Sequence, residues 1–160
     1  MSQRQLALAG DVETNPGPSM QPLSIGALNV RSLTSPTRNA ETKLDLISLL
    51  CSVNSLDIFG ISETWLDNSI PDDKILLPGF LPPFRRDRRR DGGGVAVYVS
   101  EAVAAKRCPL IEPSTGEFIC IDLALNRNHY LLCFFYRPPS ASIDDFIDNL
   151  CYIITKAKLY

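Results

Sequence analysis

The sequence lacks the features that mark several protein classes. Its 160 residues contain one histidine, and the formal net charge of −2 gives no overall basicity that would indicate nucleic-acid binding, so any such signal must be local. The five cysteines are odd in number and show no Cys-x-x-Cys spacing, which favours reduced, buried thiols in an intracellular protein over disulfides or a zinc site. No apolar run approaches the roughly 18 residues of a membrane span, so no membrane partner is predicted.

What remains is the composition of one globular domain. At 45% hydrophobic and 21% charged residues, the chain is ordinary in composition and long enough for a core. We place the domain at residues 23–160 and predict that residues 1–22 lie outside it. The apolar segment Leu6–Ala9 is too short for the core of a signal peptide.

The most informative stretch runs from Asp57 to Leu66. Asp57–Ile61 is predicted to be a buried strand that delivers the carboxylate of Glu63 to its carboxyl end. In α/β sheets, chemistry collects outside the carboxyl ends of strands. A carboxylate held there suits a hard cation such as Mg²⁺. On this stretch alone, a surface role for Glu63 at the start of a loop stays equally open.

A predicted β-α-β unit precedes Glu63. Residues 23–30 are predicted to form the first strand, with Asn29 near its end, and residues 40–53 a helix. The topology places Asn29 and Glu63 at the same end of neighbouring strands. A buried Asn29 offers donors and an acceptor to a phosphate or to a metal-ligating carboxylate. Arg31 adds positive charge there, or serves as a structural ion-pair partner.

A basic segment follows a long Pro-containing loop over residues 65–84. Its arginines are Arg85, Arg86, Arg88, Arg89 and Arg90. We predict a flexible loop that lies along a nucleic-acid backbone, and a solvated turn is the alternative. Residues 92–94 are three glycines that open the predicted strand Val95–Val99; because they precede a strand, they are not a nucleotide-binding fingerprint.

The C-terminal third is predicted to be a hairpin and a helix. The apolar runs Glu117–Leu125 and His129–Tyr136 are predicted to be inner strands, with the Tyr136 hydroxyl at a strand end and Arg137 next to it. Ser142 is predicted to cap a last helix with a buried apolar stripe. The stripe consists of Ile143, Phe146, Ile147, Leu150, Ile153 and Ile154.

Four motifs, in this order, resemble one family. They are Leu-Asn-Val-Arg-Ser-Leu around Asn29, Ile-Ser-Glu-Thr-Trp-Leu around Glu63, the strand Gly-Gly-Gly-Val-Ala-Val-Tyr-Val, and Tyr-Arg-Pro-Pro at Tyr136. Over residues 24–155 the chain resembles the endonuclease domain of non-LTR retrotransposons, in the apurinic-endonuclease-like endonuclease/exonuclease/phosphatase superfamily. The resemblance implies an α/β fold, a four-layered sandwich of two β-sheets flanked by helices.

The same resemblance implies a function and its residues. It implies nicking of DNA that depends on Mg²⁺ or Mn²⁺ and primes reverse transcription. Glu63 would ligate the metal, Asn29 would orient the phosphate or the metal shell, and Tyr136 would donate to a phosphate oxygen. Arg31, Arg137 and the basic segment would contact DNA. A reverse transcriptase is expected downstream in the parent polyprotein, with synthesis in the cytoplasm and action in the nucleus.

Two motifs of the family are missing. Neither Gly-Asp-x-Asn nor Ser-Asp-His occurs, so the sandwich is expected to be incomplete at the C-terminus and catalysis by this chain alone to be weak. His129 cannot replace the missing base, because seven residues of strand separate it from Tyr136 by roughly 23 Å. Two alternatives stay open: a non-catalytic nucleic-acid-binding remnant that uses Arg85–Arg90, and a branch of the superfamily that acts on phosphomonoesters or lipids.

The segment before the domain carries a second resemblance. Its residues are Asp11, Val12, Glu13, Asn15, Pro16, Gly17 and Pro18. They are similar to the 2A-type ribosome-skipping peptides of picornaviruses and some retrotransposons. The resemblance implies that the bond between Gly17 and Pro18 is not made in a fraction of translation events. A Pro/Gly linker is the alternative.

Overall fold

The computed structural model describes residues 22–36, 42–89 and 91–159. The ribosome-skipping motif and Arg90 lie outside them. Elements in chain order are β1 (Ile25–Asn29), α2 (Lys43–Val53), β2 (Ile58–Ser62), the 3-10 helix η1 (Asp72–Ile75), β3 (Phe84–Arg86), β4 (Val95–Val99), β5 (Ala104–Arg107), β6 (Glu117–Leu125), β7 (Asn128–Tyr136) and α3 (Ile143–Ala157). Among the described residues, no helix is long and apolar enough to cross a membrane.

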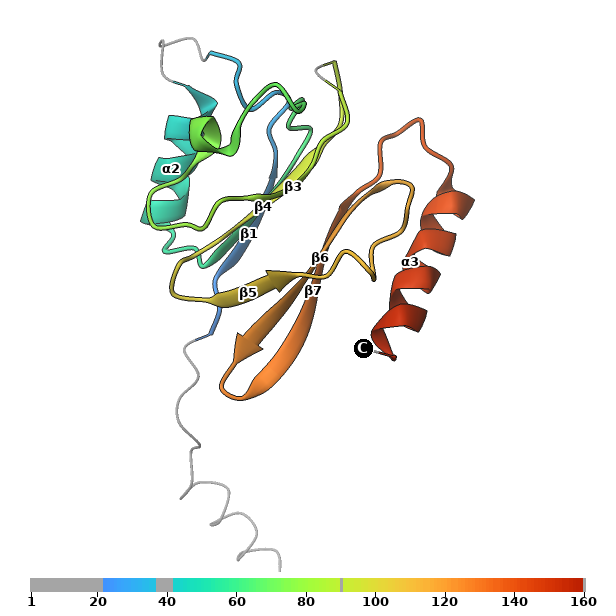
Figure 1. The fold of residues 1–160 in the computed structure, drawn as a ribbon. Coiled ribbons are helices and arrows are strands. Elements are labelled where there is room, and N and C mark those ends of the chain that lie inside the picture. Colours follow the sequence, from blue (N-terminus) through green and yellow to red (C-terminus); the bar gives the residue numbers. More distant parts are fainter. Residues whose placement is uncertain (1–21, 37–41, 90, 160) are drawn as a thin grey trace, which may run out of the picture.

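The elements form four layers. One sheet has the strand order β1-β2-β4-β3 and the other the order β5-β6-β7. Helix α2 covers the outer face of the first sheet and α3 that of the second, with the two sheets facing each other between them (Figure 1). This arrangement confirms the predicted four-layered α/β sandwich.

Alternating side chains explain why the central strands are apolar on both faces. In β4, Val95, Val97 and Val99 lie between the sheets, whereas Ala96 and Tyr98 lie under α2. Strand β6 likewise directs alternate residues to the other sheet and to α3. Successive side chains of a strand point to opposite faces, so a strand between two layers needs apolar residues throughout.

The register of the first two strands confirms the predicted β-α-β unit. Strands β1 and β2 are parallel, and Asn29 pairs with Ser62, so Asn29 and Glu63 lie at the same end of adjacent strands. Helix α2 begins later than predicted, because Thr42 and Asp45 form a capping box at its start. Asn29 itself is exposed and not buried as expected, since β1 is an edge strand.

Three further predictions are wrong. Strand β7 is an edge strand and is mostly half-buried or exposed, not an inner strand. The stripe of α3 is only partly core: Ile153 is buried, while Ile143, Ile147 and Ile154 are exposed. Periodicity shows which side of a helix faces inward, but the narrow three-stranded sheet limits how much of that side is covered. The third prediction concerns the basic segment, whose first residues belong to β3 and are not in a flexible loop.

Candidate functional site

Both sheets contribute to a cluster of polar side chains at one end of the sandwich. Asn29 ends β1, and Glu63 directly follows β2. In the second sheet, Tyr136 ends β7 opposite Glu117, which begins β6. The Tyr136 hydroxyl lies close enough to Glu63 and Asn29 for both to shift its pKa, so side chains of the two sheets meet here. The three residues proposed from sequence for catalysis are therefore brought together.

The Glu63 carboxylate is held by several donors. Its Oε2 accepts a hydrogen bond from Trp65 Nε1 at 2.7 Å and one from the Gly93 amide at 3.2 Å. Partial burial acts to raise the pKa of Glu63, but the hydrogen bonds from Tyr136, Trp65 and Gly93 outweigh it, so the pKa lies below its ordinary value. Glu63 is thus ionised near neutral pH.

The backbone that carries Glu63 is fixed on both sides. Leu33 N donates to Thr64 O at 2.9 Å, and Trp65 N donates to Gly93 O at 2.9 Å. Glu63 and Trp65 have φ values of 57° and 55°, in the left-handed region that non-glycine residues seldom adopt. Such conformations persist only where the surroundings enforce them. The site is therefore preorganised by backbone pairing.

Tyr136 keeps its proton over a wide pH range. The hydrogen bond to the Glu63 carboxylate, together with burial, raises the pKa of Tyr136 to about 12. The hydroxyl therefore remains a hydrogen-bond donor near neutral pH. Asn29 acts in the opposite direction and lowers the pKa of Tyr136, and its Oδ1 accepts from the Arg31 amide at 3.3 Å. The Arg31 side chain is exposed beside this end of β1.

Glu117 is a residue of this site that sequence reasoning missed. Its side chain is buried, its Oε2 accepts from the Gly94 amide at 2.7 Å, and its Oε1 accepts from Arg88 Nη1 at 3.2 Å. Burial raises the pKa of Glu117 above its ordinary value. The available signal was a carboxylate, directly after Gly116, at the start of a strand whose next four residues, 118–121, are all apolar.

The glycines that precede β4 connect the two carboxylates. The Gly93 amide donates to Glu63 and the Gly94 amide donates to Glu117. Both glycines have positive φ, 75° and 86°. A Cβ on Gly93 would lie 2.6 Å from Glu117 Oε1, so the close approach of that carboxylate requires glycine. These amides bind side chains of the protein itself.

The proposed DNA-contacting arginines fall into different environments. Arg85 is only 12% exposed and is bonded to Asp72 at 2.9 Å and Asp87 at 2.6 Å, so its guanidinium fastens the preceding loop. Arg89 is 69% exposed and weakly paired with Asp91 at 3.7 Å. Three others bind within the protein: Arg86 to the carbonyls of Pro113 and Ser114, Arg88 to Glu117, and Arg137 to the carbonyls of Pro138 and Ala141.

The donor set at Glu63 fits Mg²⁺. A magnesium ion is commonly held by one or two carboxylates, with water and substrate phosphate completing its shell. One ionised carboxylate, with a side-chain amide and a phenol nearby, matches this pattern. Among the described residues, no group of three His, Cys, Asp or Glu side chains is placed to hold a metal. His129 is bonded to Asp122 near the β6–β7 turn, away from Tyr136.

Comparisons with known proteins address the fold. A family search and a search of curated proteins give no match to this sequence. A search of solved structures does give matches. The fold is similar to that of a retrotransposon endonuclease domain. That structure is the "Endonuclease domain of TRAS1, a telomere-specific non-LTR retrotransposon", with a TM-score of 0.60 and 12% identity over 85% of this chain. The chain spans about half of that structure, 54% of its length.

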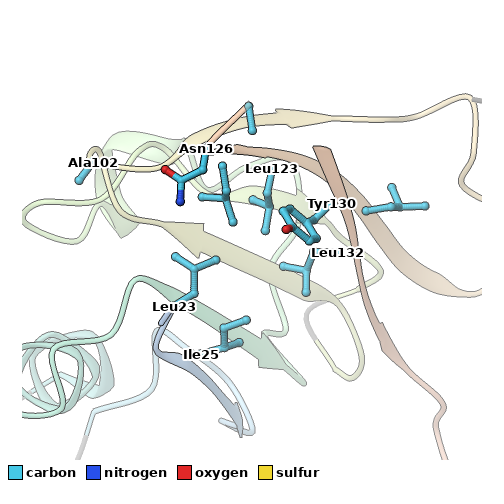
Figure 2. Close-up of a pocket in the computed structure, with 10 residues that line it drawn as sticks. Leu23, Ile25, Ala102, Leu123, Asn126, Tyr130 and Leu132 are labelled. Carbon is cyan, nitrogen blue, oxygen red and sulfur yellow. The ribbon is translucent and has the colours of Figure 1, made fainter. Parts of the chain in front are cut away.

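This endonuclease-like fold has a further cavity that is not the candidate site. A groove of about 680 Å³ lies at the other end of the sheets, between the start of β1 and the β6–β7 turn. Leu23 and Ile25 face Leu123, Tyr130 and Leu132 across it (Figure 2). Its lining is mainly aliphatic. The groove therefore lacks the convergent polar side chains that the Glu63 end provides.

Proposed function

We propose that this chain carries the metal-binding half of a DNA endonuclease site of the non-LTR retrotransposon type. One observation carries the proposal: Asn29, Glu63 and Tyr136, far apart in sequence, converge at the strand ends of both sheets, where Glu63 and Asn29 both shift the pKa of Tyr136. The similarity of the fold to a solved retrotransposon endonuclease domain supports it. In such a reaction, DNA is the substrate and the phosphodiester bond is hydrolysed.

Each residue has a role that follows from its surroundings. Glu63, whose pKa is lowered, would ligate Mg²⁺ or Mn²⁺ as a carboxylate. Tyr136, which stays protonated, would donate a hydrogen bond to a non-bridging phosphate oxygen. Asn29 would orient the phosphate through its amide. The bound metal would supply charge stabilisation to the phosphate and to the leaving oxygen.

Nicking by these 160 residues alone is expected to be slow. Among the described residues near Glu63, there is no histidine to act as a base, because the chain has only His129 and it lies near the β6–β7 turn. The lack of a general base commonly reduces rates by about 10²–10⁴-fold. A downstream reverse transcriptase, action in the nucleus and release between Gly17 and Pro18 belong to the same proposal of retrotransposon origin.

A plasmid-nicking assay tests the proposal. The full chain is incubated with supercoiled plasmid and Mg²⁺, with an EDTA reaction alongside, and is compared with Glu63→Gln. We expect slow, metal-dependent nicking that falls at least tenfold in the variant, because the neutral amide is a poor magnesium ligand. The matched control is Glu101→Gln, an exposed glutamate near the other end of β4. Equal nicking by Glu63→Gln and the wild type would refute the role of Glu63.

A second candidate function is DNA binding without catalysis. The observation that favours it is the group of Arg86 and Arg88 beside the site. In that case, duplex DNA would bind with strong salt dependence, and binding would survive Glu63→Gln while no nicking is detected. The plasmid assay and a binding measurement on the same protein samples separate the two functions.

A further inference from the structure

A second cleft adjoins the candidate site. It has a volume of about 570 Å³ and lies between residues 86–88, which lead out of β3, and residues 138–141, between β7 and α3. Gly116 and Glu117 also line it. Both bounding segments rise at the same end of the sandwich (Figure 1). Since Glu117 pairs with Tyr136 across the β6–β7 ladder, the cleft lies next to the Glu63 cluster.

Among the charged side chains that line the cleft, the Arg86 guanidinium is the one without a described carboxylate partner. Asp87 is paired with Arg85, and Glu117 with Arg88, so each of these pairs is neutral overall. Arg86 donates to the carbonyl oxygens of Pro113 and Ser114, at 2.9 and 2.7 Å, and no described carboxylate pairs with it. Carbonyl partners fix the direction of a guanidinium without cancelling its charge. The four charged side chains that line the cleft, Arg86, Asp87, Arg88 and Glu117, sum to zero, and Arg85, which pairs with Asp87 from outside the lining, brings the group to +1.

Arg88, which lines the cleft, is held by buried partners. Its Nη1 donates to Glu117 Oε1, and a Cβ on Gly93 would lie 2.5 Å from Arg88 Cδ, so the side chain lies close over that glycine. At 41% exposed, the guanidinium still reaches solvent. One bond to Glu117 leaves further N–H groups of the five-donor fork unused. Glu117 is thus a positioning residue for Arg88.

The opposite wall is also fixed. Arg137 Nη1 donates to Ala141 O at 2.8 Å, and the Ala141 amide donates to Pro138 O at 3.0 Å. These bonds hold residues 138–141 in a turn. A cleft with two firm walls and two oriented guanidinium groups is suited to an extended polyanion, because arginine forks match phosphate geometry.

We propose that this cleft is a subsite for a backbone phosphate of nucleic acid, next to the scissile phosphate, with Arg86 and Arg88 as its ligands. The proposal rests on the proposed function for the identity of the polyanion as DNA. It assigns phosphate contact to two arginines of the basic segment and excludes Arg85, whose donors are used internally by Asp72 and Asp87.

The test is DNA binding without metal, so that it does not depend on nicking. A fluorescently labelled duplex of mixed sequence is titrated with the full chain in EDTA at several salt concentrations. We expect Arg88→Gln to weaken binding about tenfold, the effect of losing one charge-assisted contact. The slope of log Kd against log salt should fall by about one. Arg88→Lys, which keeps the charge but loses the fork, should recover part of the affinity.

The matched control is Arg89→Gln, which makes the same change in net charge at an exposed arginine outside the cleft. It should weaken binding less than about threefold. Arg86→Gln is expected to weaken DNA binding as much as Arg88→Gln does. Because Arg86→Gln also removes two hydrogen bonds to carbonyl oxygens, circular dichroism melting is used to check that this variant still folds. If it does not fold, Arg88→Gln alone tests the subsite. Equal losses in Arg88→Gln and Arg89→Gln would overturn the proposal.

Failure of this inference is distinguishable from failure of the proposed function. If the wild type does not nick but Arg88→Gln binds DNA more weakly than Arg89→Gln, the phosphate subsite stands and the endonuclease proposal falls. If Mg²⁺-dependent nicking needs Glu63 while Arg88→Gln and Arg89→Gln bind alike, the subsite is wrong and the endonuclease proposal stands.

Discussion

Glu63 and Glu117 are two carboxylates held by adjacent amides of one glycine pair, yet the fold shifts their pKa values in opposite directions. Glu63 comes from the first sheet, and donors including Tyr136, Trp65 and Gly93 lower its pKa despite partial burial. Glu117 comes from the second sheet, and burial raises its pKa although Gly94 and Arg88 are bonded to it. For Glu63 the combined effect of the donors on the pKa is larger than that of burial, whereas for Glu117 the effect of burial is larger.

The opposite pKa shifts and the different burial make the two carboxylates available to different partners. An ionised, partly exposed Glu63 is available to a cation or to substrate. A buried Glu117 is available only to its neighbours, and it holds the glycine turn and Arg88 in place. In the proposed function, similar carboxylates would therefore take a chemical role and a positioning role through their surroundings alone. Three substitutions test this difference between Glu63 and Glu117.

The largest effect is expected from Gly94→Ala, which disturbs both carboxylates. A Cβ at this position would lie 2.4 Å from Oγ1 of the fully buried Thr64, and the φ of 86° is unfavourable for alanine. Overpacking and left-handed strain together should lower the free energy of unfolding by about 3 kcal/mol. Urea denaturation measures the change.

Gly92→Ala serves as the control for this prediction. A Cβ on Gly92 would meet no atom within 4 Å, so its stability should change by less than about 0.5 kcal/mol. If both alanine variants were equally stable, the glycine turn would not hold the two carboxylates under constraint.

Glu63→Gln should have an intermediate effect that depends on pH. It removes charge-assisted hydrogen bonds, so the free energy of unfolding at pH 7 should fall by roughly 1.5–2 kcal/mol. Because the pKa of Glu63 is lowered, its stabilisation is present above its ordinary value of 4.5 and is lost as pH falls through the folded pKa. Denaturation at several pH values should show the wild type and the variant converging in acid.

Glu117→Gln should have the smallest effect and the opposite pH trend. The raised pKa means that the contribution of Glu117 to stability is present below its ordinary value of 4.5 and is lost as pH rises through the folded pKa. The variant keeps an acceptor for Gly94, so its stability at pH 7 should stay within about 1 kcal/mol of the wild type. Relative to the wild type, the Glu117→Gln variant should therefore gain stability as pH rises from 4.5 through the folded pKa of Glu117. A constant difference between the two proteins at all pH values would contradict the assigned shift.

Much of the fold was predictable because the spacing of apolar residues that marks strands and helices depends only on residues close together in the chain. The buried strand before Glu63, the strand Val95–Val99 and the hairpin leading to Tyr136 all form close to their predicted positions. The parallel pairing that aligns Asn29 with Ser62 followed from the β-α-β order. Exposure was less predictable: β7 and α3 have apolar patterns, but how far they are covered depends on the neighbouring layers.

The residues of the candidate site likewise fall into those that the sequence predicts and those that depend on the fold. Asn29, Glu63 and Tyr136 could be named from sequence because each follows or ends an apolar strand. The arginines could not be sorted, because whether Arg85 faces solvent depends on Asp72 and Asp87, which only the fold brings to it.

The alternation of layers and the strand ends at which polar side chains stand follow from local sequence patterns, since both depend on residues close together in the chain. The packing of the two sheets was needed to show that Glu117 joins the site, that Gly93 and Gly94 bind two carboxylates, and that Glu117 holds Arg88 in the lining of a cleft. These facts depend on contacts between segments more than twenty residues apart, and on the desolvation that results when two sheets are packed face to face.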